Sequence, residues 1–365
     1  MKKMRIFGLG ILVLLWAVIT CAAWFGPAKD VSESERRKLA QFPNLTVKTV
    51  LNGKFMSEFE TYTLDQFPLR DNFRQLKALF HYNVLGQKDN NDIYIVHDYA
   101  AKLEYPLNEV SVSNAVKKFN HIYETYLAES ETVIFAPVPD KGYYLGEANG
   151  YPAMDYEALF ATLEQGMPWA EFVNLTDQLE AGDYYRTDTH WRQERILKVA
   201  ETLCKALGTE WFREEELTPV PVERPFYGVY YGQAALPMDA DLMVVMENEM
   251  LVNCTVYNQE TGKTTGIYDW DKLSSRDLYD VYLSGAAALL TIENPNATTD
   301  KELVVFRDSF GSSMVPLLVK DYKTVTVVDI RYVASDWVGR YVDFHGQDVL
   351  FLYSTLILNS SNTLK

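Results

Sequence analysis

The pattern of apolar and polar positions begins with one long apolar run. Residues 6–25 contain no charged side chain. A helix of that length, at about 1.5 Å per residue, spans roughly 30 Å, the thickness of the hydrocarbon core of a bilayer. The three charged residues before the run are all basic (Lys2, Lys3 and Arg5), which places the N-terminus in the cytoplasm and the rest of the chain outside. We expect an uncleaved transmembrane anchor and cytoplasmic tip over residues 1–27; a cleaved signal peptide is the alternative.

Residues 28–90 combine a charged stretch with helical periodicity. Apolar side chains recur at helical spacing over residues 55–64 and again over 73–80, with a turn at residues 66–70 between them. We therefore expect two helices behind a solvated stalk. The charged residues that indicate the stalk are Glu33, Glu35, Arg36, Arg37 and Lys38.

From residue 91 onward, short β-rich apolar runs alternate with helical segments. This pattern predicts an α/β fold with a three-layer core around a parallel sheet. The expected strands cover residues 93–96, 132–136, 303–306, 324–328 and 349–353, and the expected helices cover 110–127, 156–164, 191–207 and 312–319.

One section of this domain has a different texture. Residues 211–296 carry short apolar runs, such as 243–246 and 251–257, that are cut by Gly, Asn, Asp and Pro. We interpret the section as a β-rich insertion in a domain over residues 91–365. A separate module is the alternative.

Composition removes several classes of function. The chain has 34 basic and 50 acidic residues, a net charge of −16, which disfavours a nucleic-acid partner. Its three cysteines and five histidines show no zinc-type spacing, so we expect neither a metal site nor a cofactor. Cys204 and Cys254 would lie in an oxidising compartment, and a disulfide or two free thiols are both open there.

Two short segments contain the residue types of a nucleophilic site. Ser309 directly follows a predicted strand, at the sheet edge where open α/β folds bind ligands. Asp188 and His190 lie two residues apart before a predicted helix, so they supply the base and the orienting carboxylate that a serine nucleophile needs. The alternative is structural, with Ser309 and Asp188 or Thr189 capping helices and His190 filling an interface.

Further candidates surround these three residues. Backbone N–H groups of the turn from Ser309 to Gly311 are the expected oxyanion donors. Lys141 follows a predicted strand at the same edge, where it contacts substrate or is merely solvated. The predicted oxyanion or substrate-binding residues are Phe310, Gly311, Arg307, Trp191 and Lys141.

Asp188-Thr189-His190-Trp191 resembles the Asp-x-His-Trp box of the DHHW family and of the related alginate O-acetylation proteins, which belong with the SGNH hydrolase-like group. Other boxes follow in the same order, so the resemblance covers residues 33–355. They are Glu35-Arg36-Arg37-Lys38-Leu39, Asp65-Gln66-Phe67-Pro68-Leu69-Arg70-Asp71, Tyr279-Asp280-Val281-Tyr282-Leu283-Ser284-Gly285, Asp308-Ser309-Phe310 and Val328-Asp329-Ile330-Arg331-Tyr332.

The resemblance implies a bacterial, membrane-anchored, extracytoplasmic protein with an SGNH-like domain. It further implies a polysaccharide substrate and a multipass membrane protein as acyl donor. By the resemblance, Ser309 is the nucleophile, His190 the base and Asp188 its orienter. Thr189 matches the alginate proteins, whereas typical DHHW members have histidine there. Ala286 stands where the family's Gly-Asn turn has asparagine.

Two functions from different classes follow. The first is a serine-dependent O-acyl transferase or esterase, with acetyl the expected group, acting on an exported or cell-envelope polysaccharide. The second is a non-catalytic polysaccharide-binding or assembly subunit of an acetylation complex, which the missing asparagine favours. A lipid-active hydrolase is a weaker third reading, because no apolar lid segment is present.

Overall fold

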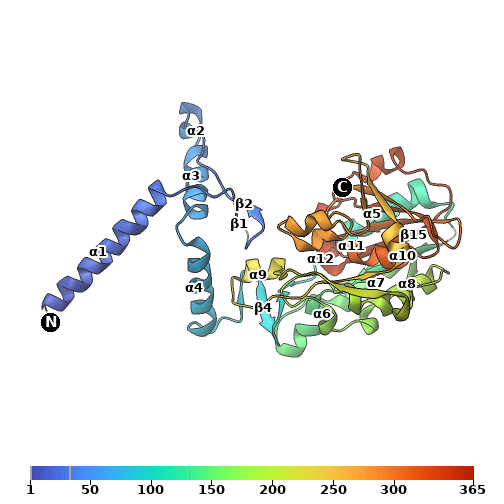
Figure 1. Ribbon diagram of the computed structural model, residues 1–365, viewed down its shortest axis with the longest axis horizontal. Helices are drawn as coiled ribbons and strands as arrows, with labels where there is room; N and C mark the ends of the chain where they lie inside the picture. Colours follow the sequence, from blue (N-terminus) through green and yellow to red (C-terminus); the bar gives the residue numbers. More distant parts are fainter. Residues whose placement is uncertain (1, 33, 131) are drawn as a thin grey trace. The chain divides into compact units, whose positions relative to one another are not determined.

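The computed structural model describes residues 2–32, 34–130 and 132–365, so Glu33 of the predicted stalk lies outside the described residues. The chain divides into two compact units (Figure 1). The first consists of Met1–Asn91 and Tyr231–Pro237, and the second of Asp92–Tyr230 and Met238–Lys365.

The first unit is mainly helical. The apolar run forms most of α1 (Lys2–Phe25), and its residues Ile6–Phe25 have a mean hydropathy of 2.5, which suits a membrane anchor or a signal sequence. The two predicted amphipathic helices are present as α3 (Lys54–Asp65) and α4 (Arg70–Asn83). Shorter elements complete the unit: β1 (Val31–Ser32), β2 (Arg37–Lys38), α2 (Val47–Leu51) and β3 (Asp89–Asn90).

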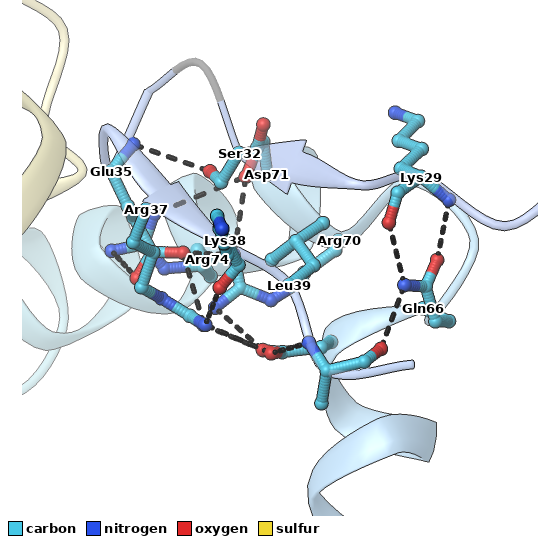
Figure 2. A network of polar contacts seen from close by, with 12 residues as sticks. Lys29, Ser32, Glu35, Arg37, Lys38, Leu39, Gln66, Arg70, Asp71 and Arg74 are labelled. Carbon is cyan, nitrogen blue, oxygen red and sulfur yellow. Dashed lines mark hydrogen bonds and ion pairs between the residues drawn. The ribbon is translucent and has the colours of Figure 1, made fainter. Parts of the chain in front are cut away.

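Two charged residues of the predicted stalk, Glu35 and Arg37, form ion pairs that hold this unit together (Figure 2). Arg37 bonds both carboxylate oxygens of Asp65, at 2.8 and 2.5 Å, and the Ala40 N–H donates to the same carboxylate at 2.9 Å. These bonds, Arg37 foremost, lower the pKa of Asp65 to about 2. Glu35 accepts a hydrogen bond from Arg70 of α4. The stretch is therefore pinned to the ends of α3 and α4 and is only partly solvated.

The second unit contains an eight-stranded sheet of mixed direction. Its order is β11-β10-β12-β14-β13-β15-β6-β7, and the five strands from β14 to β7 are parallel. The predicted α/β class with a mostly parallel sheet is thus confirmed. The strands are β6 (Val133–Val138), β7 (Glu171–Phe172), β10 (Thr255–Asn258), β11 (Lys263–Gly266), β12 (Leu289–Glu293), β13 (Lys301–Arg307), β14 (Tyr322–Val328) and β15 (Asp348–Ser354).

Helices cover both faces of the sheet because its central strands are apolar on both faces. In β6, Ile134 and Ala136 join one hydrophobic core, and Val133 and Phe135 join the other. The first core also receives α8 (Leu197–Ala206) and α11 (Gly311–Met314). The second receives α5 (Glu109–Ile122), α7 (Tyr156–Gly166) and α12 (Thr355–Asn359). The other elements are β4 (Ile93–Val96), β5 (Tyr99–Lys102), α6 (Lys141–Leu145), β8 (Thr218–Pro221), α9 (Val229–Ala234), β9 (Val244–Glu247) and α10 (Glu249–Asn253).

The β-rich section contributes directly to the sheet. Strands β10, β11 and β12 extend it in antiparallel fashion beyond β14, while β8 and β9 form a separate antiparallel pair. The start of the run at 251–257 is helical, in α10, rather than strand.

The predicted helix over residues 191–207 begins later than expected. Trp191 forms an antiparallel bridge with Tyr184, which keeps the backbone extended at that point, and a 3₁₀ turn covers Gln193–Arg195. The α-helix starts only at Leu197. Residues 188–190 consequently lie on a connecting loop, where their side chains are free to face the sheet edge.

Candidate active site

Ser309 lies in a tight turn between β13 and α11. The preceding residue, Asp308, is fully buried, and its carboxylate accepts hydrogen bonds from the N–H groups of Phe310 (2.9 Å) and Ser354 (2.8 Å). Ser354 ends the neighbouring strand β15. The turn is therefore fixed to two adjacent strand ends, and Ser309 remains partly exposed.

The structure brings the three predicted triad residues together. The Ser309 Oγ lies 2.8 Å from the His190 Nε2, and the His190 Nδ1 lies 2.6 Å from the Asp188 Oδ1. His190 is 8% exposed and Asp188 is 1% exposed. A carboxylate in this position holds the imidazole with its Nδ1 protonated, which leaves Nε2 free to accept the serine proton.

A backbone segment that the sequence analysis did not identify supports Asp188. The Val229 N–H donates to the second carboxylate oxygen, Oδ2, at 2.8 Å. The Gly228 N–H donates to the Thr187 hydroxyl at 2.9 Å, and the Tyr230 N–H donates to the Thr187 carbonyl at 3.0 Å. No sequence pattern marks this segment, because its contribution comes from main-chain atoms.

Gly228 to alanine tests this support. An added Cβ would lie 2.2 Å from the Asp188 Cβ and 2.4 Å from the Thr187 carbonyl oxygen, so the loop or Asp188 must move. We expect a destabilisation of about 1–3 kcal/mol and loss of serine reactivity, measured by urea unfolding and by active-site labelling. Gly208 to alanine is the control. Gly208 has a positive φ and open space around it, so alanine there strains the backbone without a steric clash. Normal labelling of Ser309 in the Gly228 variant would show that this segment does not support Asp188.

Aromatic rings fix the plane of the His190 imidazole. The Tyr279 ring stacks on it with centroids 3.9 Å apart and planes 8° apart, and Phe310 packs at 5.0 Å. The Tyr279 hydroxyl is 2.7 Å from the Ser313 Oγ. The Trp191 Nε1 donates to Ser313 Oγ at 3.0 Å and to the Phe310 carbonyl at 3.1 Å, so the buried Trp191 supports the site from behind.

Tyr279 to leucine is expected to lower kcat/KM for an acetyl ester by about tenfold, because an aromatic stack contributes about 0.5–1.5 kcal/mol beyond its area. Tyr279 to phenylalanine keeps the stack and loses only the hydroxyl contact with Ser313. We expect it to retain most of the activity in the same ester assay. Equal losses in both variants would assign the effect to the hydroxyl instead.

The predicted oxyanion donors are only partly available. The Phe310 N–H is bonded to the Asp308 carboxylate, and the Gly311 N–H donates to the Asp308 carbonyl at 3.1 Å. The Ser309 N–H has no hydrogen-bond partner among the described residues. Of the three backbone N–H groups that the turn was expected to provide, only that of Ser309 is therefore free to stabilise an oxyanion.

Arg307 and Lys141 lie behind the site and not at its surface. Arg307 is 1% exposed; its Nη1 donates to the Asp308 carbonyl at 3.2 Å, and burial lowers the pKa of its guanidinium. Lys141 is 2% exposed, and its Nζ donates to the carbonyls of Tyr185 (2.8 Å) and Arg186 (3.3 Å), just upstream of Asp188. Neither of the two places predicted for Lys141, contact with substrate or full solvation, matches this position.

The pH dependence of stability tests the burial of Lys141. Desolvation lowers its pKa to about 7, against the attraction of Asp188, Asp241 and Asp140, whereas the unfolded chain has a lysine pKa of about 10.4. Between these values the unfolded chain binds more protons, so stability rises with pH. We expect the free energy of urea unfolding of the natural protein, relative to Lys141→Met, to increase from pH 7 to about pH 9. A constant difference would contradict the lowered pKa.

Comparisons with known proteins support the resemblance drawn from the sequence. A family model described as DHHW protein matches residues 176–328, and the predicted resemblance to that family is confirmed. The match includes Asp188, His190 and Ser309. A sequence comparison with curated proteins gives no match.

The DHHW family protein and PatB1 share the fold of this chain at low sequence identity, and AlgJ is a more distant structural match. A DHHW family protein from Eubacterium siraeum is 21% identical and has a TM-score of 0.61, over 75% of this chain and 94% of that one. Bacillus cereus PatB1 is 16% identical with a TM-score of 0.60, over 73% and 96%; a second PatB1 structure, with a sulfonyl adduct, is 17% identical with a TM-score of 0.58, over 73% and 95%. The O-acetyltransferase domain of Pseudomonas putida AlgJ is 12% identical with a TM-score of 0.46, over 73% and 92%.

Proposed function

We propose that the protein is a membrane-anchored, extracytoplasmic, serine-dependent O-acyl transferase or esterase with an SGNH-like core. Its proposed substrate is an exported or cell-envelope polysaccharide, and its proposed acyl group is acetyl. The observation that carries the proposal is the continuous hydrogen-bonded series from Ser309 through His190 to Asp188, with a partly exposed serine at one end and a buried carboxylate at the other.

The geometry supports a two-step acyl transfer. The Ser309 Oγ attacks the carbonyl carbon of an acetyl ester while the His190 Nε2 takes its proton. The oxyanion that forms is stabilised by the Ser309 N–H. When the intermediate collapses, the donor oxygen leaves with the proton from His190, and the acetyl group stays on Ser309. A sugar hydroxyl then accepts the group in a transferase, and water accepts it in an esterase; His190 again moves the proton.

Anchoring and partner complete the proposal. The apolar helix α1 is the proposed membrane anchor, with the N-terminus in the cytoplasm and residues 28–365 outside. A transferase at this location needs an activated acyl group from across the membrane. A multipass membrane protein is therefore the proposed donor.

Covalent labelling tests the nucleophile. The full chain, purified in detergent, is treated with a fluorophosphonate, and the modified peptide is mapped by mass spectrometry. A sulfonyl fluoride is a suitable second probe, since a PatB1 structure carries a sulfonyl adduct. We expect an adduct on Ser309 that is absent in His190→Ala. His121→Ala is the matched control, because this exposed histidine pairs with Asp336 at 2.6 Å in the same unit.

One observation favours a second function, a non-catalytic polysaccharide-binding or assembly subunit. Two of the three backbone donors of the serine turn are occupied, and Ala286 stands in place of the expected asparagine. Absence of any adduct in well-folded protein would favour this function, with the trio holding a ligand or partner without chemistry.

A further inference from the structure

Helix α4 exposes a continuous apolar stripe. Phe73, Leu76 and Phe80 follow one another at spacings of three and four residues, so their side chains share one face of the helix; Leu69, which caps the N-terminus of α4, precedes Phe73 by four residues. The exposed fractions of Leu69, Phe73, Leu76 and Phe80 are 68%, 43%, 62% and 49%. A surface helix ordinarily buries such a face.

The opposite face of α4 is the one that packs inside the unit. Ala78, about half a turn around the helix axis from Leu76 and from Phe80, is fully buried. Arg74 donates to the Gly232 carbonyl at 2.8 Å, in the segment that returns to this unit from residue 231. The packing of α4 within its unit is thus satisfied without the stripe.

The apolar surface continues onto neighbouring elements. Leu64 of α3 and Phe67 of the connecting turn are 65% and 41% exposed. Both line an open cavity of about 660 Å³ together with Phe73, Ala235 and six polar residues, among them Glu35, Arg70 and Lys77, so the cavity itself is of mixed polarity. Val47 and Leu51 of α2 are 77% and 82% exposed. Apolar surface gathered in this way marks a contact with another protein or with a membrane.

The chain between α1 and this surface limits where the surface can lie. Residue 47 follows Phe25 by 22 residues, which reach at most about 75 Å when fully extended. Fixation of residues 37–40 to Asp65 shortens that reach. With α1 in a bilayer, this short tether keeps the stripe within reach of the membrane surface.

The distribution of charged residues along the chain favours a lipid surface as the partner of the stripe. Residues 28–91 contain ten basic and eight acidic residues, whereas residues 92–365 contain 21 basic and 42 acidic. Residues 28–91 therefore carry a net charge of +2 and residues 92–365 one of −21, so an anionic lipid surface repels the second range and not the first. Lys48 and Lys77 are exposed on the same helices as the apolar residues, and lysines near an anionic surface contribute about 1 kcal/mol each.

We propose that α2, α3 and α4 form a second membrane contact, in which the stripe Leu69-Phe73-Leu76-Phe80 inserts into the interfacial layer of an anionic phospholipid surface. The contact rests on the proposed anchoring by α1. It is independent of the proposed chemistry at Ser309.

The test uses the full chain in nanodiscs of phosphatidylcholine with about one third phosphatidylglycerol. The exposed Cys21 is replaced by serine, and the fluorophore NBD is attached at Leu76→Cys. Glu157→Cys, on an exposed position of α7, is the matched control. Co-elution of the protein with the discs shows that α1 is anchored, whether or not the stripe contacts the lipid. Phosphatidylcholine labelled with a doxyl group near the headgroup quenches NBD that lies in the interface.

We expect doxyl lipid to quench the label at position 76 and aqueous iodide to leave it largely unaffected, with the reverse at position 157. Quenching at 76 should weaken in discs without phosphatidylglycerol, and Phe73→Ser with Phe80→Ser should abolish it. Iodide access without doxyl quenching, in protein that co-elutes with the discs, would overturn the proposal. Protection from both quenchers would also overturn it, because it would identify a protein surface as the occupant.

Discussion

Ser309 to alanine is expected to lower the rate of acetyl-ester turnover by about 10⁵-fold and to leave the fold intact. Among the described residues the hydroxyl makes one side-chain hydrogen bond, with the His190 Nε2, so its removal eliminates the nucleophile and changes little else. The measurement is hydrolysis of p-nitrophenyl acetate by the purified full chain, with thermal unfolding monitored by circular dichroism.

Ser312 provides the matched control for that experiment. It is a buried serine three residues further on, in α11, and within the described part of the chain no hydrogen bond joins its side chain to His190. Ser312→Ala should keep its activity. Undiminished turnover by Ser309→Ala would show that the hydrolysis arises elsewhere, and the triad assignment would then be wrong.

Asp188 to asparagine is expected to reduce kcat/KM by about 10³–10⁴-fold while the overall structure is retained. One carboxylate oxygen faces the His190 Nδ1 at 2.6 Å, and the other accepts the Val229 N–H at 2.8 Å. An amide has one oxygen only. If its NH₂ faces Val229, two donors meet; if it faces His190, the imidazole is driven to the tautomer that cannot accept the serine proton.

The surface pair formed by His121 and Asp336 provides the control for this substitution. Its nitrogen–oxygen distance is also 2.6 Å, but both side chains are exposed. Asp336→Asn should leave ester turnover unchanged. If Asp188→Asn retained full activity as well, Asp188 would be a structural cap and His190 would need another orienting group.

The sequence was sufficient to predict the central strands: β6, β13 and β15 contain apolar runs that are buried on both faces, and β14 is rich in valine and threonine and ends in the buried pair Val327 and Val328. It was also sufficient to bring Ser309, Asp188 and His190 to one edge, since a serine after a buried strand and an Asp-x-His pair are both local patterns. The start of α8 was not predictable, because the bridge between Tyr184 and Trp191 is a tertiary contact that overrides helical spacing.

The residues that support the triad could not be predicted from the sequence, for a related reason. Val229 acts through its N–H, Gly228 acts by having no side chain, and the stack of Tyr279 on His190 joins residues that are far apart in the chain. Lys141 illustrates the opposite error. A lysine after a strand suggests a solvent-facing group, yet its ammonium is folded inward onto the carbonyls that precede Asp188.

The position of β6 in the sheet has a consequence for how an exported chain of this kind folds. β6 pairs with β15, and Val133 lies opposite Val349, more than two hundred residues later. Contacts of such long sequence separation form slowly. If the chain crosses the membrane from its N-terminal end, the wholly apolar β6 emerges long before its partner strand. During that interval it is exposed to aggregation, and we expect folding of this unit to depend on extracytoplasmic chaperones that bind apolar segments until β15 arrives.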